Sequence, residues 1–256
     1  MGRNDILDAV KGAAEPLPWF LAVWEGGSAS FGRVDEWSDV DIGAAVEDGR
    51  VEESFAAIES ALARLGPVVD RWVLAPADNV KPQRMYRFAE DGAPLVDLGV
   101  FPASTRPEDR FLERRRHGQA RVLFDRTGFT ADRPQDPAAW RERLRRRIAE
   151  LRSRVDFLAR YPVKSALRGD LPEAISFYQA FVLRPLVEVL RIRHDPWRHD
   201  FDVRYLRHDL PEPARSRLFA LWTVKDAEDL LRKRDEAEAW FREEMRALDP
   251  DALRLD

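Results

Sequence analysis

The sequence contains no cysteine, which excludes disulfide bonds and zinc sites built on thiolates. It has no run of about 18 apolar residues, so no helix that spans a membrane is predicted. The opening residues MGRNDILDAV lack the apolar core of a secretory signal, and we therefore expect a soluble, cytoplasmic protein. An excess of positive charge is also missing. The formal net charge is −4, which offers no general attraction to a nucleic-acid backbone.

What the sequence does contain is enough apolar material for a folded core. The chain has 256 residues, of which 45% are hydrophobic and 34% are charged. This composition is typical of a globular protein with one large domain or two modest ones.

The first half of the chain alternates short segments with strand-like and helix-like patterns. Helices are predicted at residues 5–14 and 51–65. Strands are predicted at residues 19–24, 39–46, 67–74 and 121–128, together with a hairpin at residues 85–101 that turns at Asp91-Gly92. A segment rich in turn formers, residues 127–137, then reads as a linker.

Beyond the linker the pattern is helical throughout. Apolar residues recur at helical spacing over residues 140–158, 173–193 and 225–248. The second of these helices contains Pro185, where we expect a kink. The sequence therefore predicts a mixed α/β domain followed by a helical one.

Two aspartates, Asp39 and Asp41, lie two positions apart on the strand predicted at residues 39–46. Successive strand residues point to opposite faces, so both carboxylates share one face while Val40 and Ile42 share the other. Mg²⁺ is commonly held by one or two carboxylates together with substrate phosphates. This strand thus predicts a magnesium site on one face and a core contact on the other.

A glycine-rich turn precedes these aspartates. Gly26-Gly27-Ser28 follows an apolar run, and such a turn offers backbone N–H groups and a hydroxyl without bulky side chains. Phosphate oxygens are the ligands that this chemistry favours. Either motif alone is common in solvated loops and edge strands, but their order and spacing together indicate a functional site.

The combination resembles the signature of the nucleotidyltransferase superfamily that includes DNA polymerase beta and the antibiotic nucleotidyltransferases. Gly27-Ser28 matches its Gly-Ser turn, and Asp39-Val40-Asp41-Ile42 matches the following Asp-apolar-Asp-apolar motif. One departure is Gly26, where the family usually has an apolar residue. The resemblance is closest to the two-domain branch that modifies aminoglycosides and lincosamides.

The resemblance implies an α+β fold: a mixed-sheet nucleotidyltransferase domain, residues 1–130, followed by an all-helical bundle domain for substrate, residues 131–256. It also implies a third carboxylate on a neighbouring strand. Asp97, on the polar face of an otherwise apolar strand, fits best, and Asp70 is the competitor.

The roles implied by the resemblance are specific. Asp39 and Asp41 would hold Mg²⁺, with two ions expected, and Asp97 would complete the second metal site or take the acceptor proton. Gly27 and Ser28 would bind the phosphates of a nucleoside triphosphate, with ATP favoured. The catalytic set is therefore Asp39, Asp41 and Asp97.

In the helical half, Asp170 and Glu173 stand three apart before an apolar helix, which is typical of a capping box. The alternative is that they line the acceptor pocket. Three His-Asp pairs at residues 194–209 are typical of a polar loop, with a metal or nuclease site as the alternative. The arginine-rich segment 141–160 favours a surface amphipathic helix over a nucleic-acid stripe.

The leading hypothesis is a Mg²⁺-dependent enzyme that transfers a nucleoside monophosphate from a nucleoside triphosphate to a hydroxyl of a small molecule, aminoglycoside- or lincosamide-like. Nucleic acid and membranes are not expected partners, and the sequence does not indicate an oligomeric state. Two alternatives stay open: a member that modifies a protein or RNA, as antitoxin-like enzymes do, and a non-catalytic nucleotide-binding module.

Overall fold

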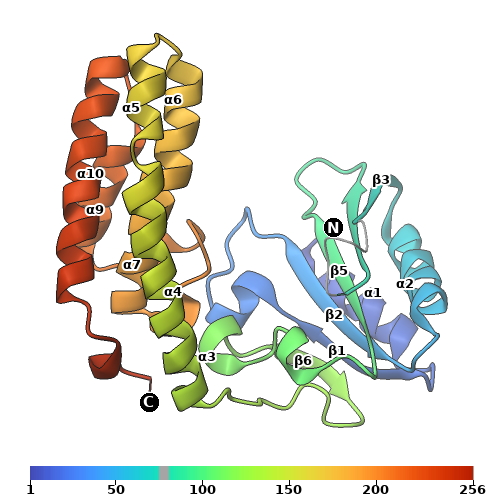
Figure 1. Cartoon of the computed structure of the whole chain (residues 1–256). Helices are drawn as coiled ribbons and strands as arrows, with labels where there is room; N and C mark the ends of the chain where they lie inside the picture. The colour runs from blue at the N-terminus through green and yellow to red at the C-terminus, as the bar shows by residue number, and fades with distance from the viewer. Residues whose placement is uncertain (75–80, 256) are drawn as a thin grey trace. The chain divides into compact units, whose positions relative to one another are not determined.

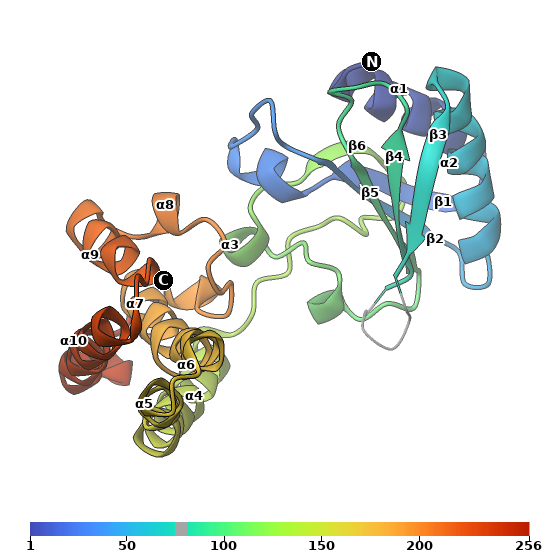
Figure 2. The ribbon, with the colours of Figure 1, turned by 90° about the horizontal axis from the view of Figure 1, so that it is seen from above.

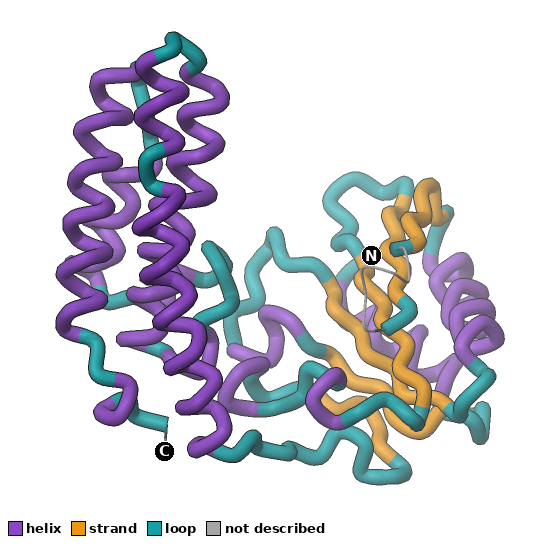
Figure 3. The backbone as a smooth tube through the Cα atoms, in the orientation of Figure 1, coloured by secondary structure: helices purple, strands orange, loops and turns teal. Residues whose placement is uncertain are grey.

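The computed structural model describes residues 1–74 and 81–255. The chain divides into two compact units, Met1–Pro134 and Gln135–Asp256. In the described ranges all strands belong to the first unit, and the second is built from helices and loops (Figure 3). None of the helices in these ranges combines the length and apolar character needed to cross a membrane.

The first unit is built on a six-stranded sheet with the order β3-β4-β5-β2-β1-β6. Strands β2 and β5 pair in parallel, and the other neighbours pair antiparallel. The mixed sheet followed by a helical unit confirms the predicted α+β fold class. The strands are β1 (Phe20–Glu25), β2 (Val40–Val46), β3 (Val68–Val73), β4 (Gln83–Phe88), β5 (Val96–Pro102) and β6 (Arg121–Asp125).

Helices α1 (Arg3–Ala14) and α2 (Val51–Leu65) cover one face of this sheet (Figures 1 and 2). Alternate residues of the two parallel strands supply the core beneath them. These buried residues are Val40, Ile42, Ala44 and Val46 of β2 and Val96, Leu98 and Val100 of β5. The predicted alternation is therefore confirmed in both central strands.

Among the described residues of the first unit, no such helical cover lies on the opposite face of the sheet. A smaller apolar cluster that includes Trp24, Phe101 and Phe129 packs on part of it. Trp24 lies directly on Gly43, where an added Cβ would come within 2.2 Å of its ring. The 3₁₀ turn η1 (Gly27–Phe31) and the short α3 (Arg114–His117) contact each other, with Gln119 donating a backbone hydrogen bond to Ser30.

The second unit is an α-helical bundle with its own core. Its buried residues include the predicted stripe of α4: Trp140, Leu144, Ile148, Leu151 and Val155. The helices are α4 (Pro137–Leu158), α5 (Tyr161–Leu167), α6 (Leu171–Tyr178), α7 (Arg184–His194), α8 (Leu206–Asp209), α9 (Glu212–Trp222) and α10 (Ala227–Ala247).

The helix predicted at residues 173–193 is present as an unbroken helical stretch, but its hydrogen-bonding pattern changes within it. A π-helical segment, Gln179–Leu183, joins α6 to α7. Pro185 is the second residue after this segment and cannot donate a backbone hydrogen bond, so the widened turn lies where the normal α-helical ladder is interrupted. The kink predicted at Pro185 stays a prediction, and what the structure shows is a π-helical segment that ends two residues before it.

Candidate active site

Asp41 and Asp97 are direct register partners on the parallel strands β2 and β5. Adjacent strands lie about 4.8 Å apart, so both side chains leave the same face of the sheet as neighbours. That face is opposite to the one covered by α1 and α2. The structure thus brings together two of the three carboxylates that the sequence singled out.

Asp70, the competitor of Asp97, lies elsewhere. It is on the edge strand β3, with β4 between that strand and β5, and its side chain is 66% exposed. Arg87 pairs with it at 3.3 Å. Asp70 is therefore a surface residue that serves below as a control.

Asp39 stands one residue before β2, at the end where Asp41 and Asp97 are found. Partial burial raises the pKa of its carboxyl, the negative charge of Asp97 raises it further, and Arg3 opposes both. Arg3 also donates to the Asp39 carbonyl oxygen at 2.9 Å. The mutual repulsion with Asp97 shows that negative charge is concentrated at this end of the two strands.

The predicted glycine turn contacts these carboxylates. Gly27 has φ +57°, and a Cβ added there would lie 1.7 Å from Oδ2 of Asp41. The backbone N–H of Gly26 donates to the Asp41 carbonyl oxygen at 2.8 Å. Only glycine therefore allows both the left-handed backbone and the close approach of the Asp41 carboxylate.

Ser28 follows as a residue of η1. Its hydroxyl oxygen is buried, and among the described residues it has no hydrogen-bond partner. Leaving a buried polar group unsatisfied costs roughly 1–3 kcal/mol, so such groups are rare unless a ligand or water completes them. Ser28 is therefore suited to bind an oxygen of a ligand held beside Asp41.

Two further residues at this face were not identified from the sequence. Gln83 of β4 donates through Nε2 to both carboxylate oxygens of Asp97, at 2.5 and 2.7 Å. Lys81 extends its side chain across Gly99, where an added Cβ would come within 2.3 Å of the lysine Cε. Its ammonium nitrogen lies 4.8 Å from the centre of the Phe111 ring.

Lys81 interacts electrostatically with the two paired aspartates. Burial lowers the pKa of its ammonium, whereas the charges of Asp97 and Asp41 raise it. The signal that would have located it was Gly99, which shares the polar face with Asp97 and lacks a side chain. A glycine between two buried apolar neighbours, Leu98 and Val100, marks the place where another group lies flat on the strand.

The donor types at this face fit Mg²⁺, although the carboxylates now contact other groups. Among the described residues, no three His, Asp or Glu side chains stand together in a metal-holding arrangement. Instead Gln83 bonds Asp97, and Lys81 is attracted by Asp97 and Asp41. Mg²⁺ takes one or two carboxylates and completes its shell with water and phosphate oxygens, so adjacent aspartates beside a lone hydroxyl suit it.

The acidic pair of the second unit has a structural explanation. The Asp170 carboxylate accepts from the Glu173 backbone N–H at 3.1 Å, which confirms Asp170 as the N-cap of α6. The reciprocal half of the capping box is absent, because the Glu173 carboxylate accepts from the Ser165 hydroxyl at 2.6 Å. A role of either residue in binding an acceptor stays a prediction.

The His-Asp pairs do not form a joint site. His199 contacts Glu188 at 3.1 Å, and the buried Arg191 pairs with Asp209 at 3.0 Å. Arg193 pairs with Glu244. These contacts support the interpretation as a structured polar loop, with His199 as an exception considered below.

Comparisons with known proteins return solved structures only. No protein-family model matches the sequence, and no curated protein matches it. The chain is similar to the crystal structure of an aminoglycoside 6-adenyltransferase from Bacillus subtilis, with 16% identity, a TM-score of 0.42, and coverage of 99% of this chain and 91% of that one. It is also similar to a STING-associated CdnE c-di-GMP synthase from Capnocytophaga granulosa, with 13% identity, a TM-score of 0.31, and coverage of 96% and 82%.

Both similar structures are named as enzymes, and the first as one that transfers an adenyl group. At these identities and TM-scores neither similarity transfers a substrate or a mechanism to this chain.

Proposed function

We propose that this chain is a nucleotidyltransferase that transfers a nucleoside monophosphate from a nucleoside triphosphate to a hydroxyl group of a small molecule. The single observation that supports it most is the register of Asp41 with Asp97, with Gly27 against the Asp41 carboxylate. A structural aspartate pair on a sheet face has no need of a neighbouring glycine in the left-handed region.

The bond changes of the proposed reaction are those of a phosphoryl substitution. The acceptor oxygen attacks the α-phosphorus, a new P–O bond forms, and the bond to the bridging oxygen breaks to release pyrophosphate. The hydroxyl proton leaves to a carboxylate or to water. Mg²⁺, when bound, would offset the negative charge of the phosphates during this exchange.

Each residue of the site has a proposed part. Asp39 and Asp41 would hold Mg²⁺, and the Ser28 hydroxyl with the N–H groups around Gly27 would bind the β- and γ-phosphates. Asp97 would take the acceptor proton or bind a second ion, with Gln83 orienting its carboxylate. The two proposed roles of Asp97 can be distinguished by the conditions that change the reaction rate. A proton acceptor makes the rate depend on pH, and an ion ligand makes it depend on Mg²⁺ concentration.

A small hydroxyl-bearing acceptor, of aminoglycoside or lincosamide type, is proposed over a polynucleotide because the net charge of −4 offers phosphate backbones no attraction. ATP is proposed as the donor.

The experiment measures pyrophosphate release with Mg²⁺, each of the nucleoside triphosphates, and panels of aminoglycosides, lincosamides, RNAs and proteins. Release that requires a small acceptor and disappears in Asp41→Asn supports the proposal. The matched control is Asp70→Asn, which alters the same residue type on the exposed edge strand and is expected to keep full activity. Release that requires an RNA or a protein would replace the acceptor, and no release with any acceptor would refute the proposal.

A further inference from the structure

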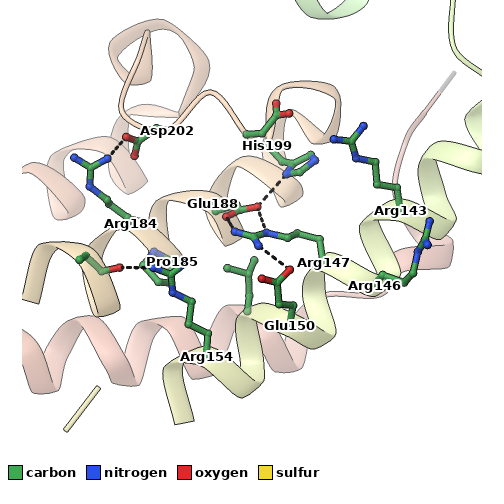
Figure 4. Close-up of a pocket in the computed structure, with 13 residues that line it drawn as sticks. Arg143, Arg146, Arg147, Glu150, Arg154, Arg184, Pro185, Glu188, His199 and Asp202 are labelled. Carbon is green, nitrogen blue, oxygen red and sulfur yellow. Dashed lines mark hydrogen bonds and ion pairs between the residues drawn. The ribbon is translucent and has the colours of Figure 1, made fainter. Parts of the chain in front are cut away.

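The second unit contains a cavity of about 620 Å³ that the proposed reaction does not explain. Its walls come from α4, from the π-segment and α7, and from residues 199–202, all within the second unit (Figure 4). Volumes of several hundred Å³ are typical of small-molecule sites. Five arginines line it: Arg143, Arg146, Arg147, Arg154 and Arg184.

Two of these arginines are neutralised. Arg147 forms a two-pronged pair with Glu188, at 2.7 Å through each nitrogen, and a further pair with Glu150 at 2.7 Å. Arg184 pairs with Asp202. These contacts hold the walls of the cavity in place rather than leaving charge for a ligand.

The other three guanidinium groups have no carboxylate partner among the described residues. Arg143 lies over the Trp140 ring at 5.0 Å, and Arg154 donates only a long hydrogen bond, 3.5 Å, to the Ala180 carbonyl oxygen. The Nε atom of Arg154 is buried without a partner. The lining also includes four carboxylates: Glu150, Glu188, Asp200 and Asp202. The five arginines therefore leave the wall with a small excess of positive charge, and no ion pair within the described ranges holds these three guanidinium groups.

His199 adds an independent sign of a ligand. Its side chain is only 4% exposed. Nδ1 lies 3.1 Å from Oε1 of Glu188, the carboxylate that also pairs with Arg147 (Figure 4). The other ring nitrogen, Nε2, is buried without a hydrogen-bond partner among the described residues. A buried imidazole held at one nitrogen presents the other one to a ligand, donating to a phosphate oxygen when charged and accepting from a hydroxyl when neutral.

We propose that this cavity binds a small phosphate monoester, a molecule of nucleotide or sugar-phosphate size. Arginine is the preferred partner of phosphate because its planar group donates two parallel hydrogen bonds. The volume exceeds what a free phosphate ion would fill, and the hydroxyls of a sugar would meet His199 and the acidic groups on the wall. The proposal does not depend on the aspartates of the first unit.

The test uses the full chain in EDTA, so that binding which requires Mg²⁺ makes no contribution. Isothermal titration calorimetry is performed with AMP, glucose 6-phosphate, inorganic phosphate and adenosine. Binding of AMP or glucose 6-phosphate is expected, with weaker binding of inorganic phosphate and none of adenosine. The two esters separate a nucleotide from a sugar phosphate as the ligand.

Variants then locate the binding. Arg154→Met keeps an apolar stem, and it should weaken binding of the ester roughly tenfold or more, since charge-assisted hydrogen bonds to phosphate are strong. His199→Gln should weaken it less. Arg145→Met is the matched control on the same helix, because Arg145 pairs with Glu142 and Asp251 and does not line the cavity.

Two outcomes would overturn the proposal. One is the absence of binding for every phosphate compound in EDTA. The other is binding that survives in Arg154→Met and His199→Gln while thermal melting shows both variants to be folded. The control Asp41→Asn separates this from the proposed catalysis, because it should abolish pyrophosphate release and leave binding of the ester in EDTA unchanged.

Discussion

The two units of this chain gather charge of opposite sign, and they do so by different means. In the first unit Asp41 and Asp97 meet because two parallel strands align in register. In the second unit Arg143, Arg147 and Arg154 line one cavity because they follow one another at intervals of four and seven positions on one helix. The first arrangement suits a cation that carries phosphates with it, and the second suits a phosphate without a metal.

The two units also differ in the groups that compensate their clustered charges. Asp97 is stabilised by Gln83 and by the nearby ammonium of Lys81, so the acidic site is compensated by groups that a ligand must displace. The basic cavity instead ties up two of its arginines with carboxylates and leaves three for a ligand. The predictions below test this contrast in order of expected effect.

The largest effect is expected for Asp97→Asn. It removes one charge from the acidic pair while Gln83 can still contact the side chain, and we expect the rate of nucleotidyl transfer to fall on the order of 10³-fold. The rate is measured as pyrophosphate release against pH and against Mg²⁺ concentration. If the variant kept more than a tenth of the rate, Asp97 would not belong to the site.

Gly27→Ala should follow, with a loss of roughly 10²-fold in rate, because the new Cβ would collide with the Asp41 carboxylate. Its left-handed backbone also costs about 1–2 kcal/mol in unfolding free energy. The control is Gly49→Ala, which has φ +83° and nothing within 4 Å of the added Cβ. It should lose comparable stability and no activity; equal activity losses in both variants would remove the role of Gly27.

Ser28→Ala separates function from stability. We expect KM for the nucleoside triphosphate to rise roughly tenfold, as for a lost hydrogen bond to a charged group. Stability should not fall, because the buried hydroxyl has no partner to lose. Ser54→Ala is the contrast, since its hydroxyl donates to the Arg50 carbonyl oxygen at 2.8 Å, and it should lower the unfolding free energy by about 1 kcal/mol.

Lys81→Met should make metal binding severalfold tighter. It keeps the apolar stem over Gly99 and removes the ammonium that the two aspartates attract. Binding of Mg²⁺ is followed by calorimetry, with Lys11→Met on α1 as a control of equal charge change. Weaker binding in Lys81→Met than in the control would show that Lys81 supports the site instead of competing for it.

The smallest effect concerns stability and pH. The pKa of Asp39 is raised in the folded chain, so between its unfolded and folded pKa values the native state holds more protons and stability falls as pH rises. Asp39→Asn should therefore slightly raise the melting temperature at pH 7 and have no such benefit at a pH well below the unfolded value. A melting temperature that drops at pH 7 would contradict the repulsion from Asp97.

Most helices and strands of the first unit could be predicted from the spacing of apolar residues and from the turn-forming residues between them. The strand at residues 39–46 was predictable because Val40, Ile42, Ala44 and Val46 alternate with polar or small residues, and the helix Val51–Leu65 because its apolar spacing is regular. Asp97 was identifiable as the one charged residue in an apolar strand. Its pairing with Asp41 was not, because register depends on the strand order that the whole chain adopts.

The residues that sequence reasoning missed make contacts over long sequence distances. Lys81 lies just before β4 and Gln83 begins it, and neither carries a local signal. Their partners lie on β5 and β2. The cavity of the second unit was hidden in an arginine-rich segment whose spacing is equally typical of a solvated helix. His199 was noticed only as part of a His-Asp pair, and its unsatisfied nitrogen is visible only once the side chains are placed.

The central claim, that the face bearing Asp41 and Asp97 holds a divalent cation with a nucleoside triphosphate, is tested most directly by Mn²⁺ binding. Mn²⁺ takes the same oxygen ligands as Mg²⁺ and its free concentration is followed by electron paramagnetic resonance in the presence of a non-hydrolysable ATP analogue. Binding should be lost in Asp41→Asn and unchanged in Asp70→Asn. Equal binding in the two variants would contradict the account.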